Sequence, residues 1–150
     1  MTRKFTLQPL LEIAQTETHT AAVSLGTHNR LLQQQQQKLD LLLQYRADYQ
    51  ARLRHRSTGG LDASALRNFH DFMQKLEEAI LQQRAAVTET LARAERAREE
   101  WQLKQRKAQA FDTLSQRHAL AELRNEMRHE QKQQDELASR ASYGKLQSHR

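Results

Sequence analysis

Apolar residues recur every three or four positions through residues 9 to 56, the spacing that places them along one stripe of an α-helix. Two positions of a seven-residue repeat form the stripe, which holds Leu11, Ala14, Thr18, Ala21, Leu25, His28, Leu32, Gln35, Leu39, Leu42, Arg46, Tyr49 and Leu53. Such a heptad pattern is typical of a coiled coil. Pro9 suits the first helical turn, where its missing N–H costs nothing. We therefore predict a first helix over about residues 9–56.

The pattern breaks once, at Ser57-Thr58-Gly59-Gly60, and then resumes. We predict a turn at 57–61, after which Asp62 or Ser64 can cap a second helix by accepting from a free backbone N–H. The second stripe holds Leu66, Phe69, Met73, Leu76, Ile80, Gln83, Val87, Thr90, Ala94, Ala97, Trp101, Lys104, Ala108 and Phe111. This helix is expected over about 62–143, with Tyr143-Gly144 as its stop and a flexible tail at 144–150.

Beyond Phe111 the apolar stripe of the second helix changes register and continues from Leu120 to Ala141. Folding back at the turn brings Pro9 opposite about residue 109, so the first helix ends where the stripe shifts. At 1.5 Å per residue the two helices would be about 70 Å and about 120 Å long. The expected fold is all-α: a long antiparallel two-helix coiled-coil hairpin whose second helix projects beyond the first. Its unpaired end should bind a partner through Leu120, Leu123, Met127 and Leu137.

Composition supports a rod and excludes several classes of protein. With 37% hydrophobic and 5% aromatic residues, the chain cannot enclose a globular core of this size. The absence of cysteine excludes disulfides, zinc fingers and thiol nucleophiles. No window approaches eighteen apolar residues, and the N-terminus lacks the apolar run of a secretory signal, so we expect no membrane insertion and a soluble, unprocessed chain.

No catalytic, cofactor or metal site is predicted. The paired glycines lack the Lys-Ser/Thr of a phosphate-binding loop, and the seven histidines do not cluster. Glu126-x-x-His129 has the spacing of a di-iron bundle motif, but such a bundle needs a second motif and two more glutamates on facing helices. A two-helix rod also offers no pocket that excludes water. We therefore expect that the chain is not an enzyme.

The net charge of +6 raises nucleic acid or an anionic membrane as possible partners. The basic surplus is spread along the chain, however, and is densest at Arg52, Arg54 and Arg56. A solvated surface laced with ion pairs is the favoured interpretation, with no specific nucleic acid bound. A nucleic-acid binder remains an alternative, and it predicts retention on DNA that falls steeply with salt.

Half of the aromatic residues gather near the turn, namely Tyr45, Tyr49, Phe69 and Phe72. A two-helix seam buries only a narrow stripe, so Tyr45 and Phe72 should stay partly exposed. These aromatic residues could form either a partner surface or a staple that closes the hairpin, and the pattern does not choose between them.

Four stretches carry a resemblance to a known family. They are Leu25-Gly26, LDLLLQYRADYQARL at 39–53, FHDFMQKLEEAI at 69–80, and Trp101 followed by KAQAFDTLSQR at 107–117. The chain resembles the FliJ family, a small component of the flagellar type III secretion apparatus. The resemblance implies a stalk, monomeric on its own, that inserts into the hexameric export ATPase ring and promotes its assembly and activity. It also implies a link to the cytoplasmic domain of the export gate protein, and binding of free export chaperones.

The resemblance further implies which residues meet the gate, and where the protein works. The matching positions are Leu42, Tyr45, Tyr49, Phe72, Leu76 and Ala79, with Lys38 and Gln83 at the edge, where the family can carry Gln and His. The protein would act in the bacterial cytoplasm, peripherally associated with the inner membrane at the flagellar base. No residues are assigned to the chaperones. The alternative is a coiled-coil adaptor or tether, unrelated to secretion, that self-associates through the stripe at 120–141.

Overall fold

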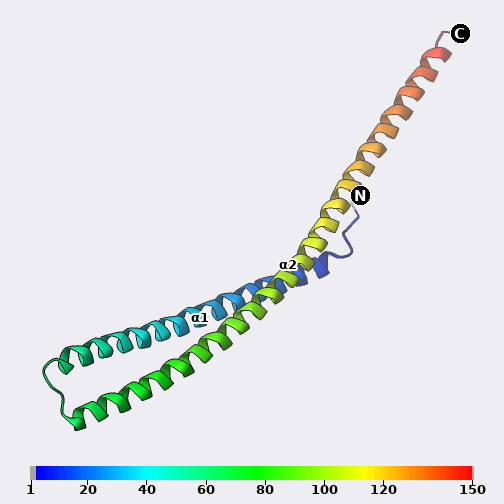
Figure 1. The fold of residues 1–150 in the computed structure, drawn as a ribbon. Coiled ribbons are helices and arrows are strands. Elements are labelled where there is room, and N and C mark those ends of the chain that lie inside the picture. The colour runs from blue at the N-terminus through cyan, green and yellow to red at the C-terminus, as the bar shows by residue number, and fades with distance from the viewer. Residues whose placement is uncertain (1–2, 150) are drawn as a thin grey trace. The chain divides into compact units, whose positions relative to one another are not determined.

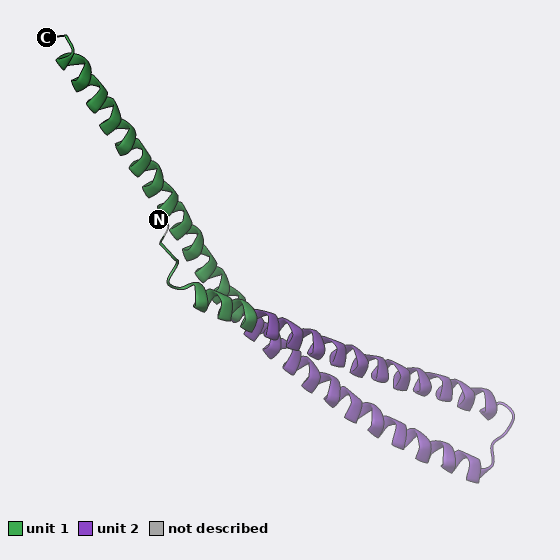
Figure 2. Cartoon of the chain, turned by 180° about the vertical axis from the view of Figure 1, so that it is seen from behind, with its two compact units in different colours: residues 1–17, 104–150 green, residues 18–103 purple. Residues whose placement is uncertain are grey.

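A computed structural model describes residues 3–149, which form two helices, α1 (Gln8–Ser57) and α2 (Ala63–Gln147) (Figure 1). These described residues contain no strand, and the prediction of an all-α helical hairpin is confirmed. With 50 and 85 residues, the helices are about 75 Å and about 128 Å long. The chain divides into two units: unit 1 combines the residues up to Glu17 with those from Lys104 onward, and unit 2 is Thr18–Leu103 (Figure 2).

The turn between the helices follows from glycine and a cap. Gly59 N–H donates to the carbonyl of Arg56 at 3.0 Å, and Gly60 has φ 81°, a left-handed conformation that glycine adopts without strain. Asp62 Oδ1 then accepts from the Ala65 N–H at 2.7 Å and so caps α2. Of the two predicted capping residues, Asp62 takes this role, while Ser64 lies inside the helix.

In unit 2 the helices run antiparallel, side by side, and share a narrow core (Figure 1). Leu39, Leu76 and Ile80 are its buried centre, and the partly buried Leu42, Leu43, Met73 and Val87 pack around them. Residues equally far from the turn pair as the fold-back predicts, for example Gln35 with Gln83 and Tyr49 with Phe69. The antiparallel pairing therefore holds from the aromatic end of the hairpin to the middle of α1.

The heptad prediction is confirmed at every position of the two stripes up to Phe111 except one. The two predicted stripes face each other and form the seam between the helices. Each stripe residue of α1 is buried or half-buried, and so is each stripe residue of α2 from Phe69 to Phe111. Leu66, in the first turns of α2, is the exception and is exposed. Trp101, the single tryptophan, is half-buried in this seam. Heptad spacing alone thus identified which side chains face the other helix.

In unit 1, α1 is preceded by residues 3–7, which we call the N-terminal strap; its last two residues form a turn in which the Gln8 N–H donates to the Phe5 carbonyl at 3.1 Å. Leu11 and Ala14 of α1 are buried, and Lys104 Nζ pairs with Glu17 Oε2 at 3.2 Å. Ahead of α1, the ring of Phe5 lies 5.5 Å from that of His118.

Two hydrogen bonds fasten the far end of the N-terminal strap to α2. His118 Nε2 donates to the Arg3 carbonyl at 2.7 Å, and the Arg3 N–H donates to Glu122 Oε2 at 3.2 Å. The strap therefore continues along α2 after α1 has ended, over a stretch for which the sequence predicted no partner. His118 and Glu122, which make these contacts, are half-buried, and so is Ser115 one turn earlier.

The end of α2 corrects one prediction. The helix does not stop at Tyr143-Gly144 but continues through Gln147, so residues 144–147 of the predicted flexible tail are helical. Gly144 lacks the positive φ of a helix-ending glycine, and its carbonyl accepts from the Ser148 N–H at 3.2 Å. A glycine inside a helix costs only about 1 kcal/mol relative to alanine, which the neighbouring residues tolerate. Arg150, the last residue of the predicted tail, lies outside the described residues.

Residues 123–147 of α2, which we call the overhang, are not covered by any described residue of unit 1. Every described residue from Leu123 onward is exposed. The overhang still carries apolar side chains, and Leu123, Met127 and Leu137 are 53%, 62% and 65% exposed. Across residues 3–149, neither helix has a stretch long and apolar enough to cross a membrane.

Candidate functional site

The seam in unit 2 is flanked by two edges of different chemistry. On α1, Lys38, Tyr45 and Arg52 follow one another at seven-residue spacing and therefore line one edge of that helix. Tyr49 lies beside Tyr45 and Arg52 on the helix surface, and its ring contacts Phe72 of α2. The contact brings Phe72, and Ala79 seven residues later, to the same edge. This edge is the one that carries the exposed aromatic residues.

The aromatic residues at this edge form a cluster whose side chains range from buried to exposed. The ring of Tyr49 lies 4.5 Å from Phe69 and 4.3 Å from Phe72, tilted by 41° and 38°. Such ring pairs contribute about 0.5–1.5 kcal/mol each beyond the area they bury. Phe69 is buried and Tyr49 half-buried, whereas Phe72 is 45% and Tyr45 62% exposed. The inner rings therefore hold the hairpin together, and the outer rings leave apolar surface in contact with solvent.

The residues implied by the family resemblance lie in this part of unit 2, at different depths. We call Leu42, Tyr45, Tyr49, Phe72, Leu76 and Ala79 the aromatic patch. Leu76 is 7% exposed and belongs to the core, and Leu42 and Ala79 are half-buried. Of the two edge residues, Lys38 is exposed, and Gln83 is half-buried and bonded to Gln35. Tyr45 and Phe72 therefore offer most of the accessible apolar surface, and Leu76 supports it from beneath.

The opposite edge is polar and carries an ion pair. Arg46 occupies a seam position, yet its guanidinium reaches out to both carboxylate oxygens of Glu77, at 3.3 and 3.2 Å. An exposed pair of this kind contributes at most about 1 kcal/mol. A shallow groove at this edge is lined by Arg46, Gln74, Glu77, Glu78, Ile80, Leu81 and Arg84. No sequence pattern predicted this groove, and the one signal for it is Leu81, an apolar residue outside the stripe.

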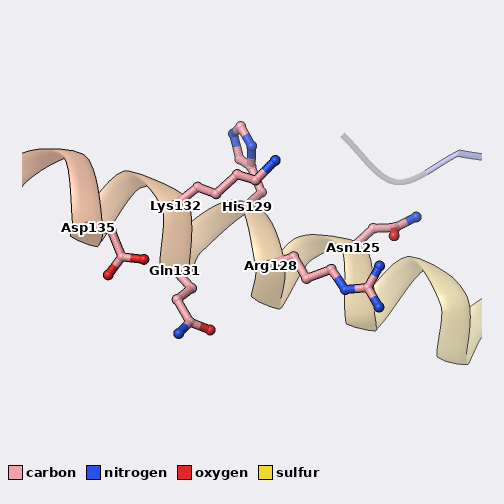
Figure 3. A pocket seen from close by; sticks show the side chains of 6 residues that line it. All are labelled: Asn125, Arg128, His129, Gln131, Lys132 and Asp135. Carbon is pink, nitrogen blue, oxygen red and sulfur yellow. The ribbon is translucent and has the colours of Figure 1, made fainter.

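The predicted partner-binding residues of α2 are accessible. Leu120, at 54% exposed, precedes the overhang, and Leu123, Met127 and Leu137 lie within it. A polar hollow also lies on the overhang, lined by Asn125, Arg128, His129, Gln131, Lys132 and Asp135. These side chains belong to a single helix, and His129 and Gln131 extend from different sides of it (Figure 3). The hollow therefore lacks the convergent polar groups of a ligand site.

Glu126 and His129 meet no second motif of this kind among the described residues. The ring Nε2 of His129 instead lies 3.3 Å from the amide nitrogen of Gln133, one turn later on the same helix. Within residues 3–149, no three His, Asp or Glu side chains come together in a way that could hold a metal ion. The described surface thus presents exposed apolar and charged side chains.

Comparison with known proteins gives a consistent result over almost the whole chain. The family model described as "Flagellar FliJ protein" matches residues 3–147. The Flagellar FliJ protein of Salmonella typhi is 34% identical over 139 residues, covering 93% of this chain and 95% of the relative. That of Escherichia coli strain K12 is 33% identical with the same coverage. A solved structure of a putative YscO homologue from Chlamydia trachomatis has a TM-score of 0.61 and 21% identity, covering 91% of this chain and 93% of that one, and shares the fold.

Proposed function

The chain belongs to the FliJ family, non-catalytic components of flagellar protein export, and from this premise we propose that it is a stalk joining two parts of the export apparatus. In this proposal the overhang and Leu120 enter the hexameric export ATPase ring and promote its assembly and activity. The aromatic patch docks on the cytoplasmic domain of the export gate protein. The protein also binds free export chaperones, and it works in the bacterial cytoplasm at the inner membrane beneath the flagellum.

The observation that carries the proposal is the uncovered overhang. An isolated helix in water is marginal, because most helical stability in proteins comes from packing an apolar face. The overhang keeps apolar side chains at Leu123, Met127 and Leu137, yet none of the described residues of unit 1 covers them. A protein partner that buries these side chains would supply the missing packing. The ATPase ring is the partner that family membership favours.

A ring around one helix pair also suggests how activity could be promoted. Six identical subunits cannot make the same contact with one asymmetric rod, so the subunits would be held in unequal states. Binding energy that differs between conformations shifts their populations. The stalk would thereby bias the ring toward states that assemble and hydrolyse ATP.

Support for the gate contact comes from the second exposed apolar surface, in unit 2. Tyr45 and Phe72 are exposed aromatic side chains over a packed base, which is the arrangement of an interface hot spot. The aromatic patch and the overhang lie in different units, so each can be tested without altering the other.

The ring contact is tested by the ATPase rate of the purified ring with the full chain and with a chain ending after Glu122. This truncation removes the overhang and keeps the N-terminal strap and its contacts to His118 and Glu122. We expect the full chain to stimulate the ring and the truncated chain to lose most of that effect. A second variant, Leu123→Ala with Met127→Ala, should lose stimulation while Gln131→Ala keeps it. Equal stimulation by all of these would refute the role of the overhang.

The exposed stripe of the overhang also fits one other function, a tether that self-associates through residues 120–141. Sedimentation at micromolar concentration separates the two, because a stalk is expected to remain monomeric and a tether to form dimers or larger species. Loss of the larger species in the Leu123→Ala, Met127→Ala variant would support the tether.

A further inference from the structure

The charges around the aromatic patch indicate the chemistry of the surface that binds it. Lys38 and Arg52 lie one heptad before and after Tyr45, on the same edge of α1. On α2, Lys75 lies three residues after Phe72 and four before Ala79, and therefore shares their face. We call Lys38, Arg52 and Lys75 the basic rim. All three side chains are exposed.

The basic rim is not neutralised by the folded chain. Within residues 3–149 the ion pairs are Arg46–Glu77, Arg93–Glu89 and Lys104–Glu17, and none includes a member of the rim. Lys38 has no carboxylate three or four residues away in either direction. Asp48 lies one turn before Arg52, Asp71 lies one turn before Lys75, and Glu78 lies one turn after Lys75. Pairs of that kind on an exposed helix are worth only about 0.3–0.5 kcal/mol, so a partner can replace them.

The centre enclosed by the basic rim is apolar. Leu41 and Tyr45 are 56% and 62% exposed on α1, and Phe72 faces solvent on α2. Asp48 is the one carboxylate on this face of α1. An apolar centre surrounded by charged side chains is the usual anatomy of a protein interface, where the rim guides approach and the centre supplies affinity.

We propose that the protein surface bound by the aromatic patch is an apolar groove bordered by carboxylates, which pair with Lys38, Arg52 and Lys75. This inference rests on the proposed function, in which that surface belongs to the export gate protein. It adds the chemical character of the gate surface and assigns Arg52 and Lys75 to the contact.

An acidic protein surface explains these features better than an anionic membrane does. A hairpin that enters a bilayer surface needs apolar side chains at its tip. The turn at the tip, residues 58–62, holds one apolar side chain, Leu61, which is half-buried, beside Thr58, Gly59, Gly60 and Asp62. The exposed aromatic side chains, Tyr45 and Phe72, lie instead along the edge of the hairpin, two turns or more from the tip, where a protein groove can reach them.

The test measures binding of the full chain to the purified cytoplasmic domain of the export gate protein. The rim variant combines Lys38→Glu, Arg52→Glu and Lys75→Glu. Its matched control combines Arg30→Glu, Arg67→Glu and Arg98→Glu, three exposed cations of unit 2 outside the aromatic patch, and changes the net charge equally. A third variant, Tyr45→Ala with Phe72→Ala, tests the aromatic patch itself. Circular dichroism verifies that each variant remains helical.

We expect the rim variant to weaken binding about 10-fold or more, mainly through slower association, and the control to change it by less than about 2-fold. Wild-type affinity should also fall as salt rises, because exposed charges are screened. If the Tyr45, Phe72 variant loses binding while the rim variant keeps it, the inference is wrong and the gate contact stands. If all variants bind like the wild type, the gate contact itself fails.

Two further outcomes would overturn the inference. Equal weakening by the rim and control variants would mean that net charge alone attracts the gate. Retention of the wild-type chain on vesicles containing phosphatidylglycerol, lost in the rim variant while gate binding is unchanged, would assign the basic rim to lipid instead.

Discussion

The side-chain amide of Gln83 donates to both the backbone carbonyl and the side-chain oxygen of Gln35, at 2.9 and 2.7 Å, across the seam of unit 2. Both residues occupy seam positions where an apolar side chain would pack. A polar pair at such positions costs stability but fixes the register, since sliding the helices would leave its half-buried groups without partners.

We therefore predict opposite effects for single and double substitution of this pair. Gln83→Leu alone leaves Gln35 without its donor and should lower the free energy of unfolding by about 1 kcal/mol. Gln35→Leu with Gln83→Leu should match or exceed wild-type stability and lose a unique register. Urea denaturation measures the first effect, and sedimentation detects the misaligned or dimeric species. A double variant less stable than either single variant would contradict the assignment.

Two glycines should respond in opposite directions to alanine. Gly26 lies inside α1, and an added Cβ would meet nothing within 4 Å, so Gly26→Ala should raise the free energy of unfolding by about 0.5–1 kcal/mol. Gly60→Ala should lower it by about 1 kcal/mol, because φ 81° strains any residue with a Cβ. Thermal melts of the two variants beside the wild type provide the comparison. Destabilisation by Gly26→Ala would reveal a close neighbour that the structure does not show.

The N-terminal strap should protect α2 locally without contributing much to global stability. Phe5→Ala removes the ring contact with His118, and amide exchange should then speed up in α2 near residues 115–122. The melting temperature should change little, because the core of unit 2 is untouched. Lys4→Ala is the matched control, since Lys4 is exposed. Unchanged exchange in the Phe5 variant would mean that the strap is not held as described.

Loss of the two outer rings of the aromatic patch should leave the helices folded but weaken binding to the gate. Tyr45→Ala with Phe72→Ala should weaken binding to the gate domain at least about 10-fold, as expected for hot-spot aromatic residues, with helicity nearly unchanged. Leu81→Ala is the control, being 71% exposed and in the groove at the opposite edge. Pull-down and circular dichroism measure the two effects. A still-helical double variant that binds normally would remove the aromatic patch from the gate contact.

The sequence predicted the seam well because one periodic signal determines both helix and burial. Residues such as Leu39 and Ile80 are buried where the heptad places them, and Asp62 caps α2 as its side chain predicts. The N-terminal strap was missed because a segment outside a helix has no such period, and its contact with His118 spans most of the chain. The predicted helix end at Gly144 was wrong because a glycine ends a helix in this way only when it adopts a positive φ.

The aromatic patch was predicted only in part, for a different reason. Spacing places Leu76 and Tyr45 in the same region, but it does not show that Leu76 is core while Tyr45 faces solvent. Such depth depends on how the two helices are staggered, which the Gln35–Gln83 and Arg46–Glu77 contacts reveal. Sequence spacing therefore locates a surface, and the packing decides which of its side chains a partner can reach.

Trp101, half-buried in the seam and without another tryptophan in the chain, gives the protein an intrinsic optical label. Indole emission shifts to the blue when water is excluded and to the red when it is admitted. Any binding partner that covers or uncovers this stretch of α2 would change the emission wavelength of the unmodified protein. Titration in a fluorimeter would then follow binding without an added dye.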